Sequence, residues 1–137
     1  MLATFFYGYN RVTEDVDMWI EDTLENRKRL RASFRELGYG DIESLETMEF
    51  VRGWTTFYAA GVELDIMTSM KGLEDASFVE CYEMAAFVTL EGVKVPFLHI
   101  NHLIANKKAV NRPIDQMDVI QLEEIKKLKE KEGKTGN

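Results

Sequence analysis

The chain has 137 residues, of which 45% are hydrophobic and 30% are charged, a composition that is ordinary for a globular domain with its own core. The formal net charge of −7 argues against broad, non-specific binding to nucleic acid, although local basic patches are compatible with it. The single cysteine, Cys81, excludes an internal disulfide and suits a reducing compartment. The apolar opening 1–7 lacks a basic segment and a cleavage site, so we predict no signal peptide, no membrane span and a cytoplasmic location.

Strands and helices alternate along the chain. Residues 1–9 have the apolar spacing of a short buried helix, and residues 15–20 alternate between apolar and polar side chains as a strand does. Asp22 or Thr23 would cap a helix that ends before Gly38. The remaining predicted elements are a loop or short helical turn within 41–49, strands at 55–60, 62–68, 85–90 and 93–98, a two-residue hairpin turn at Glu91-Gly92, helices at about 75–84 and 99–111, and a last helix from Pro113 to about Lys131.

These elements together predict an α+β fold. Helices pack against a mixed β-sheet, and the chain ends in helices. No internal repeat and no linker interrupts the pattern. We therefore predict a single domain at 1–132, followed by a flexible tail at 133–137.

The helix predicted after Thr23 is strongly basic. The simpler interpretation is a solvated face whose cations pair with Glu25 and Glu36. The alternative is a docking patch for a polyanion such as RNA, and the sequence leaves both open. The basic residues are Arg27, Lys28, Arg29, Arg31 and Arg35.

Two carboxylates share one face of the strand predicted at 15–20. Asp15 and Asp17 are two residues apart, which separates them by about 6.7 Å along a strand. Aspartate is depleted in strands and like charges repel, so a divalent cation is the usual compensation. Mg²⁺ prefers oxygen ligands and also binds phosphate oxygens. Two such ions about 3.5–4 Å apart stabilise the attacking and leaving oxygens of a phosphoryl transfer. A third carboxylate would come from the strand at 62–68, where Glu63 and Asp65 share a face.

Three segments resemble one known family in the right order. Residues 8–20, with Arg11-Val12-Thr13-Glu14-Asp15-Val16-Asp17, resemble the active-site strand of bacterial minimal nucleotidyltransferases. These enzymes belong to the DNA polymerase β-like superfamily, close to the AbiEii-type toxin and MNT-type antitoxin groups. Residues 62–69 resemble the strand that bears the family's third carboxylate, which falls on Asp65. Residues 103–118 resemble its C-terminal signature, a Leu-Ile-x-x-Lys…Gly-Arg-Pro-Lys-Asp-x-x-Asp pattern.

The resemblance implies a nucleotidyltransferase-like fold and a Mg²⁺-dependent transfer of a nucleoside monophosphate. The donor would be an NTP such as ATP, and the acceptor a hydroxyl of RNA (a tRNA, for example), of a protein or of a small molecule such as an antibiotic. Two Mg²⁺ ions would serve as cofactors, and a toxin–antitoxin partner is also implied. The resemblance assigns Asp15, Asp17 and Asp65 as catalytic and metal-binding residues, and Arg11, Thr13 and Lys107 as nucleotide-binding residues.

The role of Lys107 has two interpretations. Its ammonium would suit a triphosphate as a point charge, or it would form a salt bridge with Asp115 or Asp118. We interpret Arg112, Asp115 and Asp118 mainly as a network at the start of the last helix, with a role in the site as the alternative.

The chain departs from the family pattern at its beginning. The family has a glycine pair whose N–H groups cradle the triphosphate, and the alignment puts Met1 where the second glycine would be. We expect either a fragment or alternative start, or a chain that has lost a phosphate-binding element. The second case favours a catalytically silent binding or antitoxin module over an enzyme. Loss of the strand before the glycine pair would also expose a sheet edge, which favours a homodimer or aggregation. Smaller departures are Asn111 for glycine and Ile114 for lysine.

The other polar and aromatic residues give weaker indications of a functional site. His99 and His102 lack a third histidine or cysteine, so we do not predict a metal site there. Cys81 has no neighbouring base motif and is expected to be packed. For four aromatic side chains, core packing is the simpler interpretation and nucleobase stacking the alternative. They are Trp19, Trp54, Phe57 and Tyr58.

Overall fold

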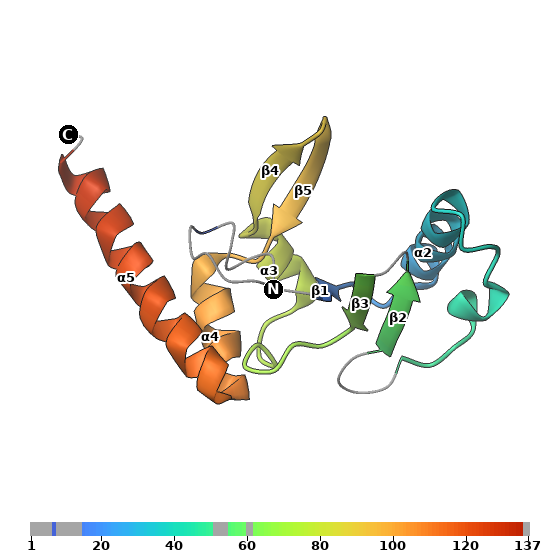
Figure 1. Ribbon diagram of the computed structural model, residues 1–137, viewed down its shortest axis with the longest axis horizontal. Helices are drawn as coiled ribbons and strands as arrows, with labels where there is room; N and C mark the ends of the chain where they lie inside the picture. The colour runs from blue at the N-terminus through green and yellow to red at the C-terminus, as the bar shows by residue number, and fades with distance from the viewer. Residues whose placement is uncertain (1–6, 8–14, 51–54, 60–61, 136–137) are drawn as a thin grey trace. The chain divides into compact units, whose positions relative to one another are not determined.

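The computed structural model describes residue 7 and residues 15–50, 55–59 and 62–135, shown as the coloured ribbon in Figure 1. The chain forms two compact units, 14–69 and 1–13 together with 70–137, which are described separately below. In the described residues there are a three-stranded sheet, a two-stranded sheet and several helices, which confirms the α+β class.

The unit at 14–69 is built on a three-stranded mixed sheet. Its strands are β1 (Asp15–Trp19), β2 (Thr55–Ala59) and β3 (Val62–Met67). β3 lies in the middle, parallel to β1 and antiparallel to β2. The strands predicted at 15–20, 55–60 and 62–68 are therefore present and form a mixed sheet, whereas those predicted at 85–90 and 93–98 form a separate two-stranded sheet.

One helix covers the apolar face of this sheet. Helix α2 (Leu24–Glu36) begins at Thr23, whose hydroxyl accepts a hydrogen bond of 3.2 Å from the backbone N–H of Asn26. It ends before Gly38, which adopts a left-handed φ of 86° that glycine tolerates best. A short 3-10 helix, η1 (Glu43–Glu46), follows. The buried core comprises Leu30, Phe34, Leu45 and Ile66, with Met18, Ile20, Phe57 and Leu64 packed against it.

The other unit contains a hairpin preceded by a short helix. Helix α3 (Phe78–Glu83) starts with a capping box between Ser77 and Glu80. Strands β4 (Ala86–Leu90) and β5 (Val93–Phe97) are joined by Glu91 and Gly92, with φ of 48° and 80°. Two consecutive positive φ values are those of a type I′ turn, the connection that matches the twist of a hairpin. The predicted two-residue turn is confirmed.

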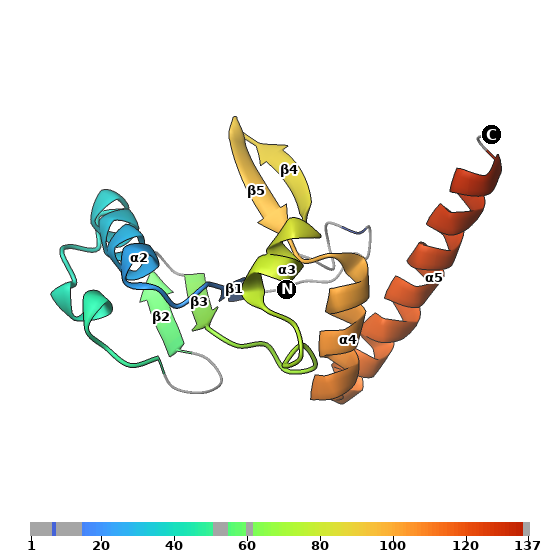
Figure 2. The same ribbon diagram turned by 180° about the vertical axis from the view of Figure 1, so that it is seen from behind.

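Two helices complete this unit. Helices α4 (Ile100–Val110) and α5 (Pro113–Thr135) pack against each other, as the views of Figure 1 and Figure 2 agree. Pro113 begins α5 as predicted, because a residue without an N–H loses nothing at a first helical position. The buried core here consists of Tyr7, Ile100, Leu103, Ile104, Val119 and Leu122.

Some predictions differ from the structure or fall outside it. Helix α5 continues to Thr135, beyond the predicted end at Lys131. Apart from Tyr7, the helix predicted at 1–9 lies outside the described residues, as does Trp54. None of the helices in the described part of the chain combines the length and apolar composition that a membrane crossing requires. The single-domain boundary at 132 stays a prediction.

Candidate metal and nucleotide site

Asp17 and Asp65 are directly paired on neighbouring strands. The parallel register of β1 and β3 places Asp17 opposite Asp65, and the antiparallel register of β2 and β3 places Thr56 opposite Asp65. Paired residues project to the same face of a sheet, so Asp17, Asp65 and Thr56 form one row across three strands. We call these three residues the carboxylate row. Within it, the Thr56 hydroxyl donates a hydrogen bond of 2.6 Å to Oδ1 of Asp65.

A second row crosses the sheet two residues away from the first. Its register partners are Asp15, Glu63 and Tyr58. The side chain of Tyr58 is 81% exposed. Core packing was therefore the wrong interpretation for Tyr58, because this face of the sheet is not covered by the core.

The two faces of the sheet have opposite chemistry. Phe57 and Ile66, which alternate with Thr56 and Asp65 along their strands, belong to the core beneath α2, and the rings of Phe57 and Phe34 are 5.2 Å apart. The apolar face is covered, while Asp17 and Asp65 are half-buried on the other face. The alternation predicted for 15–20 and 62–68 is thus confirmed, because Met18 and Ile20 pack against the same core as Leu64 and Ile66.

Carboxylate oxygens are suitable donors for Mg²⁺. Neighbouring strands lie about 4.8 Å apart, a separation at which Asp17 and Asp65 would share one cation. Oδ1 of Asp65 already accepts the Thr56 hydroxyl, and Oδ2 is the further oxygen that this carboxylate offers. Among the side chains that the structure describes, no group of three or more His, Cys, Asp or Glu residues is arranged to hold a metal ion. The side chain of Asp15, the third predicted ligand, is not among them.

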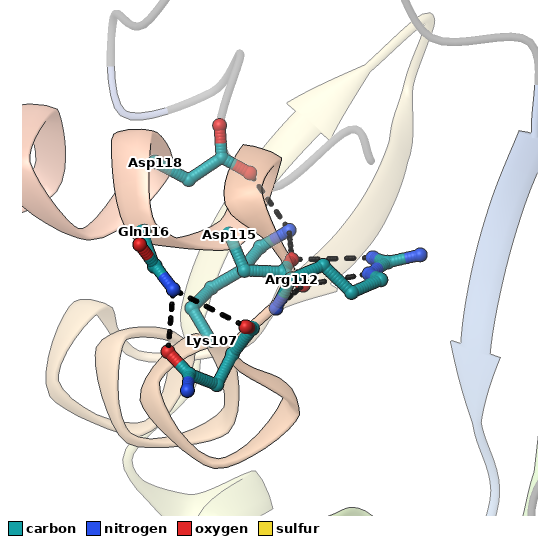
Figure 3. A network of polar contacts seen from close by, with 6 residues as sticks. Lys107, Arg112, Asp115, Gln116 and Asp118 are labelled. Carbon is teal, nitrogen blue, oxygen red and sulfur yellow. Dashed lines mark hydrogen bonds and ion pairs between the residues drawn. The ribbon is translucent and has the colours of Figure 1, made fainter.

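Lys107 lies in the other unit, inside a network of ion pairs between α4 and α5 (Figure 3). Its side chain is 1% exposed, and its Nζ lies 3.0 Å from Oδ1 of Asp115 and 2.8 Å from Oδ2 of Asp118. The salt-bridge interpretation of Lys107 is therefore confirmed, and Lys107 pairs with both predicted carboxylates, Asp115 and Asp118. We call the buried residues Lys107, Asp115 and Asp118, together with Arg112, whose side chain is 61% exposed, the buried ion network.

Arg112 makes the network electrically balanced. Its Nε donates to Oδ2 of Asp115 over 2.6 Å, and its backbone N–H donates to the same oxygen over 3.1 Å. Burial raises the pKa of Asp115, but the hydrogen bonds and charges of Arg112 and Lys107 outweigh it and bring that pKa to about 2. Two cations thus face two carboxylates, and the predicted network at the start of the last helix is confirmed.

Asn111 explains one departure from the family signature. It ends α4 with a left-handed φ of 57°, a conformation that glycine or asparagine adopts readily at a helix end. Its side-chain oxygen also accepts a hydrogen bond of 3.1 Å from Gln116 (Figure 3). Asparagine therefore performs the conformational role that a glycine would have at this position.

The basic helix α2 is extensively paired with carboxylates. Nε of Arg27 lies 2.6 Å from Asp22, and Nε of Arg31 lies 2.6 Å from Asp41. Arg29 pairs with Glu25 over 2.5 Å, as the simpler interpretation predicted, whereas Asp22 and Asp41 are partners that the sequence did not indicate. These pairs reduce the positive charge that a polyanion would meet, and they favour the solvated-face interpretation.

His99 and Cys81 have structural roles in the described part of the chain. Nδ1 of His99 accepts a hydrogen bond of 3.1 Å from the N–H of Asn101, so His99 caps the start of α4. Burial lowers the pKa of His99, which favours the neutral ring that such a cap requires. Cys81 is buried, and burial raises the pKa of its thiol, as expected for a packed rather than a reactive cysteine.

Thr56 is the polar residue that the sequence reasoning missed. Its pairing with Asp65 follows from the observed ends of β2 at Ala59 and of β3 at Val62, whereas the sequence predicted these ends at 60 and 62. Arg11 and Thr13, two predicted nucleotide-binding residues, lie outside the described residues.

Comparisons with models of protein families, with curated proteins and with solved structures found no match for this chain.

Proposed function

We propose that this protein is a Mg²⁺-dependent nucleotidyltransferase that transfers a nucleoside monophosphate from an NTP to a hydroxyl group. The observation that carries the proposal is the register pairing of Asp17 with Asp65 on the face of the sheet opposite the α2 core. Two half-buried carboxylates are held side by side there, at a cost in repulsion that a divalent cation would offset. The resemblance of residues 8–20 and 62–69 to nucleotidyltransferases assigns a function to the same pair.

In this proposal the metal ions are held by Asp17 and Asp65 of the carboxylate row together with Asp15 of the second row. Asp15 and Asp17 would bind the metal that carries the triphosphate, and Asp65 would bind the catalytic metal and help deprotonate the acceptor hydroxyl. Bound Mg²⁺ would supply charge stabilisation for the attacking and leaving oxygens. The protein contributes the positions of its oxygens, which the paired strands fix. We place this activity in the cytoplasm, where a free cysteine and NTPs occur together.

A catalytically silent nucleotidyltransferase-like binding module, such as an antitoxin, is the second candidate. One observation favours it: Lys107, the residue assigned to the triphosphate, is buried and paired with Asp115 and Asp118. A lysine so engaged would have to leave two carboxylates before it met a phosphate, at a high cost. A silent module would form a stable complex with a protein partner without Mg²⁺-dependent binding of NTPs.

Transfer of label from [α-³²P]ATP to RNA, protein and small-molecule acceptors tests the proposal. We expect Asp17→Asn to reduce labelling at least about 100-fold, because loss of even an outer partner of a metal ligand costs about 10- to 100-fold. Asp75→Asn is the matched control, since Asp75 is exposed in a turn of the other unit. Circular dichroism would confirm that both variants fold. Equal labelling by wild type and Asp17→Asn contradicts the proposal.

A further inference from the structure

We infer that Thr56 is a positioning residue that orients the carboxylate of Asp65 for a divalent cation. The inference deepens the proposed function and rests on it, because it assigns a role within the same site. It concerns a residue of β2, the strand that carries none of the predicted catalytic residues.

The contact is direct and is built into the sheet. Thr56 and Asp65 are register partners on antiparallel strands, and Oγ1 of Thr56 lies 2.6 Å from Oδ1 of Asp65 in a partly buried setting. A hydroxyl that donates to an ionised carboxylate makes one of the stronger hydrogen bonds of proteins. Threonine is also branched at Cβ, which restricts χ1 and therefore the direction of its hydroxyl.

This contact would serve two purposes at the site. It restrains the side-chain torsions of Asp65, so Oδ1 stays on the side of β2 and Oδ2 is the oxygen offered to a cation. It also places a donor next to one of two like charges in the carboxylate row, which lowers the cost of holding Asp17 beside Asp65. Partners of this kind commonly orient metal-binding carboxylates in proteins.

Three variants of the full chain separate the hydroxyl from the shape of the side chain. Thr56→Val removes the hydroxyl and keeps the branched shape, and Thr56→Ser keeps the hydroxyl. Thr55→Val is the matched control, because Thr55 is the adjacent residue of β2 and pairs with Ile66 on the apolar face. Mn²⁺ serves as the probe, with its affinity measured by electron paramagnetic resonance.

We expect Thr56→Val to weaken Mn²⁺ binding about 10- to 100-fold, the usual effect of losing such a partner. Thr56→Ser and Thr55→Val should bind Mn²⁺ as wild type does. A purely structural role would lower the melting temperature of Thr56→Val and leave its Mn²⁺ affinity unchanged, and that result overturns the inference. Failure of Thr56→Ser to restore affinity also overturns it, because shape rather than the hydroxyl would then matter.

A second measurement is independent of metal binding. Three-bond couplings from Cγ of Asp65 to its backbone N and C′ report the χ1 rotamer in solution. We expect a single rotamer in wild type and rotamer averaging in Thr56→Val. Absence of Mn²⁺ binding by wild type would refute the proposed function, and these couplings would still decide whether Thr56 orients Asp65. Identical couplings in wild type and Thr56→Val overturn the inference.

Discussion

The carboxylate row and the buried ion network arrange their charged groups in opposite ways. In the carboxylate row, Asp17 and Asp65 place two half-buried acidic groups side by side, with Thr56 as a neutral donor. In the buried ion network, Asp115 and Asp118 are enclosed between helices and share Lys107. The first cluster brings two carboxylates together, and the second pairs carboxylates with cations.

This difference indicates which cluster is arranged for a ligand. A buried carboxylate without a counter-charge is very costly, so the network must supply its own cations. Asp17 and Asp65 are only half-buried, so water and ions reach them and repulsion between them is tolerable. A divalent cation would bind where the oxygens of two neighbouring carboxylates meet. The network, by contrast, is fully explained as the junction of α4 and α5.

The largest effect should follow from removing the central cation of the network. Lys107→Met leaves Asp115 and Asp118 buried without their shared partner, so we expect a loss of about 3–5 kcal/mol in the free energy of unfolding. Urea unfolding, followed by circular dichroism, would measure it.

The neighbouring lysine provides a matched control. Lys108 pairs with Glu123 over 2.6 Å at the surface, with 57% of its side chain exposed. Lys108→Met should therefore cost less than about 1 kcal/mol. If the two variants are equally stable, burial does not distinguish the two ion pairs and the interpretation of the network is wrong.

A smaller effect should appear as acid sensitivity. The pKa of Asp115 is about 2 in the folded chain and 3.8 is its ordinary value, so its stabilisation is complete above about pH 4 and is lost as the pH falls toward 2. Asp115→Asn lacks this titration. We therefore expect its urea midpoint to fall less steeply between pH 4 and pH 2 than the wild-type midpoint does.

Other carboxylates also contribute to the loss of stability at low pH, in wild type and in Asp115→Asn alike. Ion pairs lower the pKa of Asp22 and Asp41 as well. Asp75→Asn, which alters an exposed aspartate, should keep the wild-type slope. If the urea midpoints of wild type and Asp115→Asn fall equally steeply with pH, the pKa of Asp115 does not differ between the folded and the unfolded chain. That result would contradict the interpretation of the network.

Local signals were sufficient to predict most elements. The Thr23 cap, the Glu91-Gly92 turn and Pro113 each determine a boundary through backbone chemistry that acts within a few residues. Alternation likewise separated the acidic from the apolar residues of β3. These features depend on short segments, so they are readable without knowledge of the tertiary structure.

Pairings between distant segments were harder to predict. The sequence left open whether Lys107 contacts a phosphate or a carboxylate, because that depends on how α4 and α5 pack. Tyr58 looked like a core residue by type, and only the register of β2 reveals that it lies on the exposed face. Thr56 was missed for the same reason, since its partner Asp65 lies on another strand.

The central claim is that the carboxylate row, and not the buried ion network, binds a divalent cation. Paramagnetic broadening of amide signals by substoichiometric Mn²⁺ in ¹⁵N-labelled protein tests it most directly, because it locates the ion along the chain. We predict that signals around Asp17 and Asp65 broaden first, while those around Asp115 and Asp118 keep their intensity. Broadening at Asp115 and Asp118, or broadening spread over the acidic surface without preference for β1 and β3, would contradict the claim.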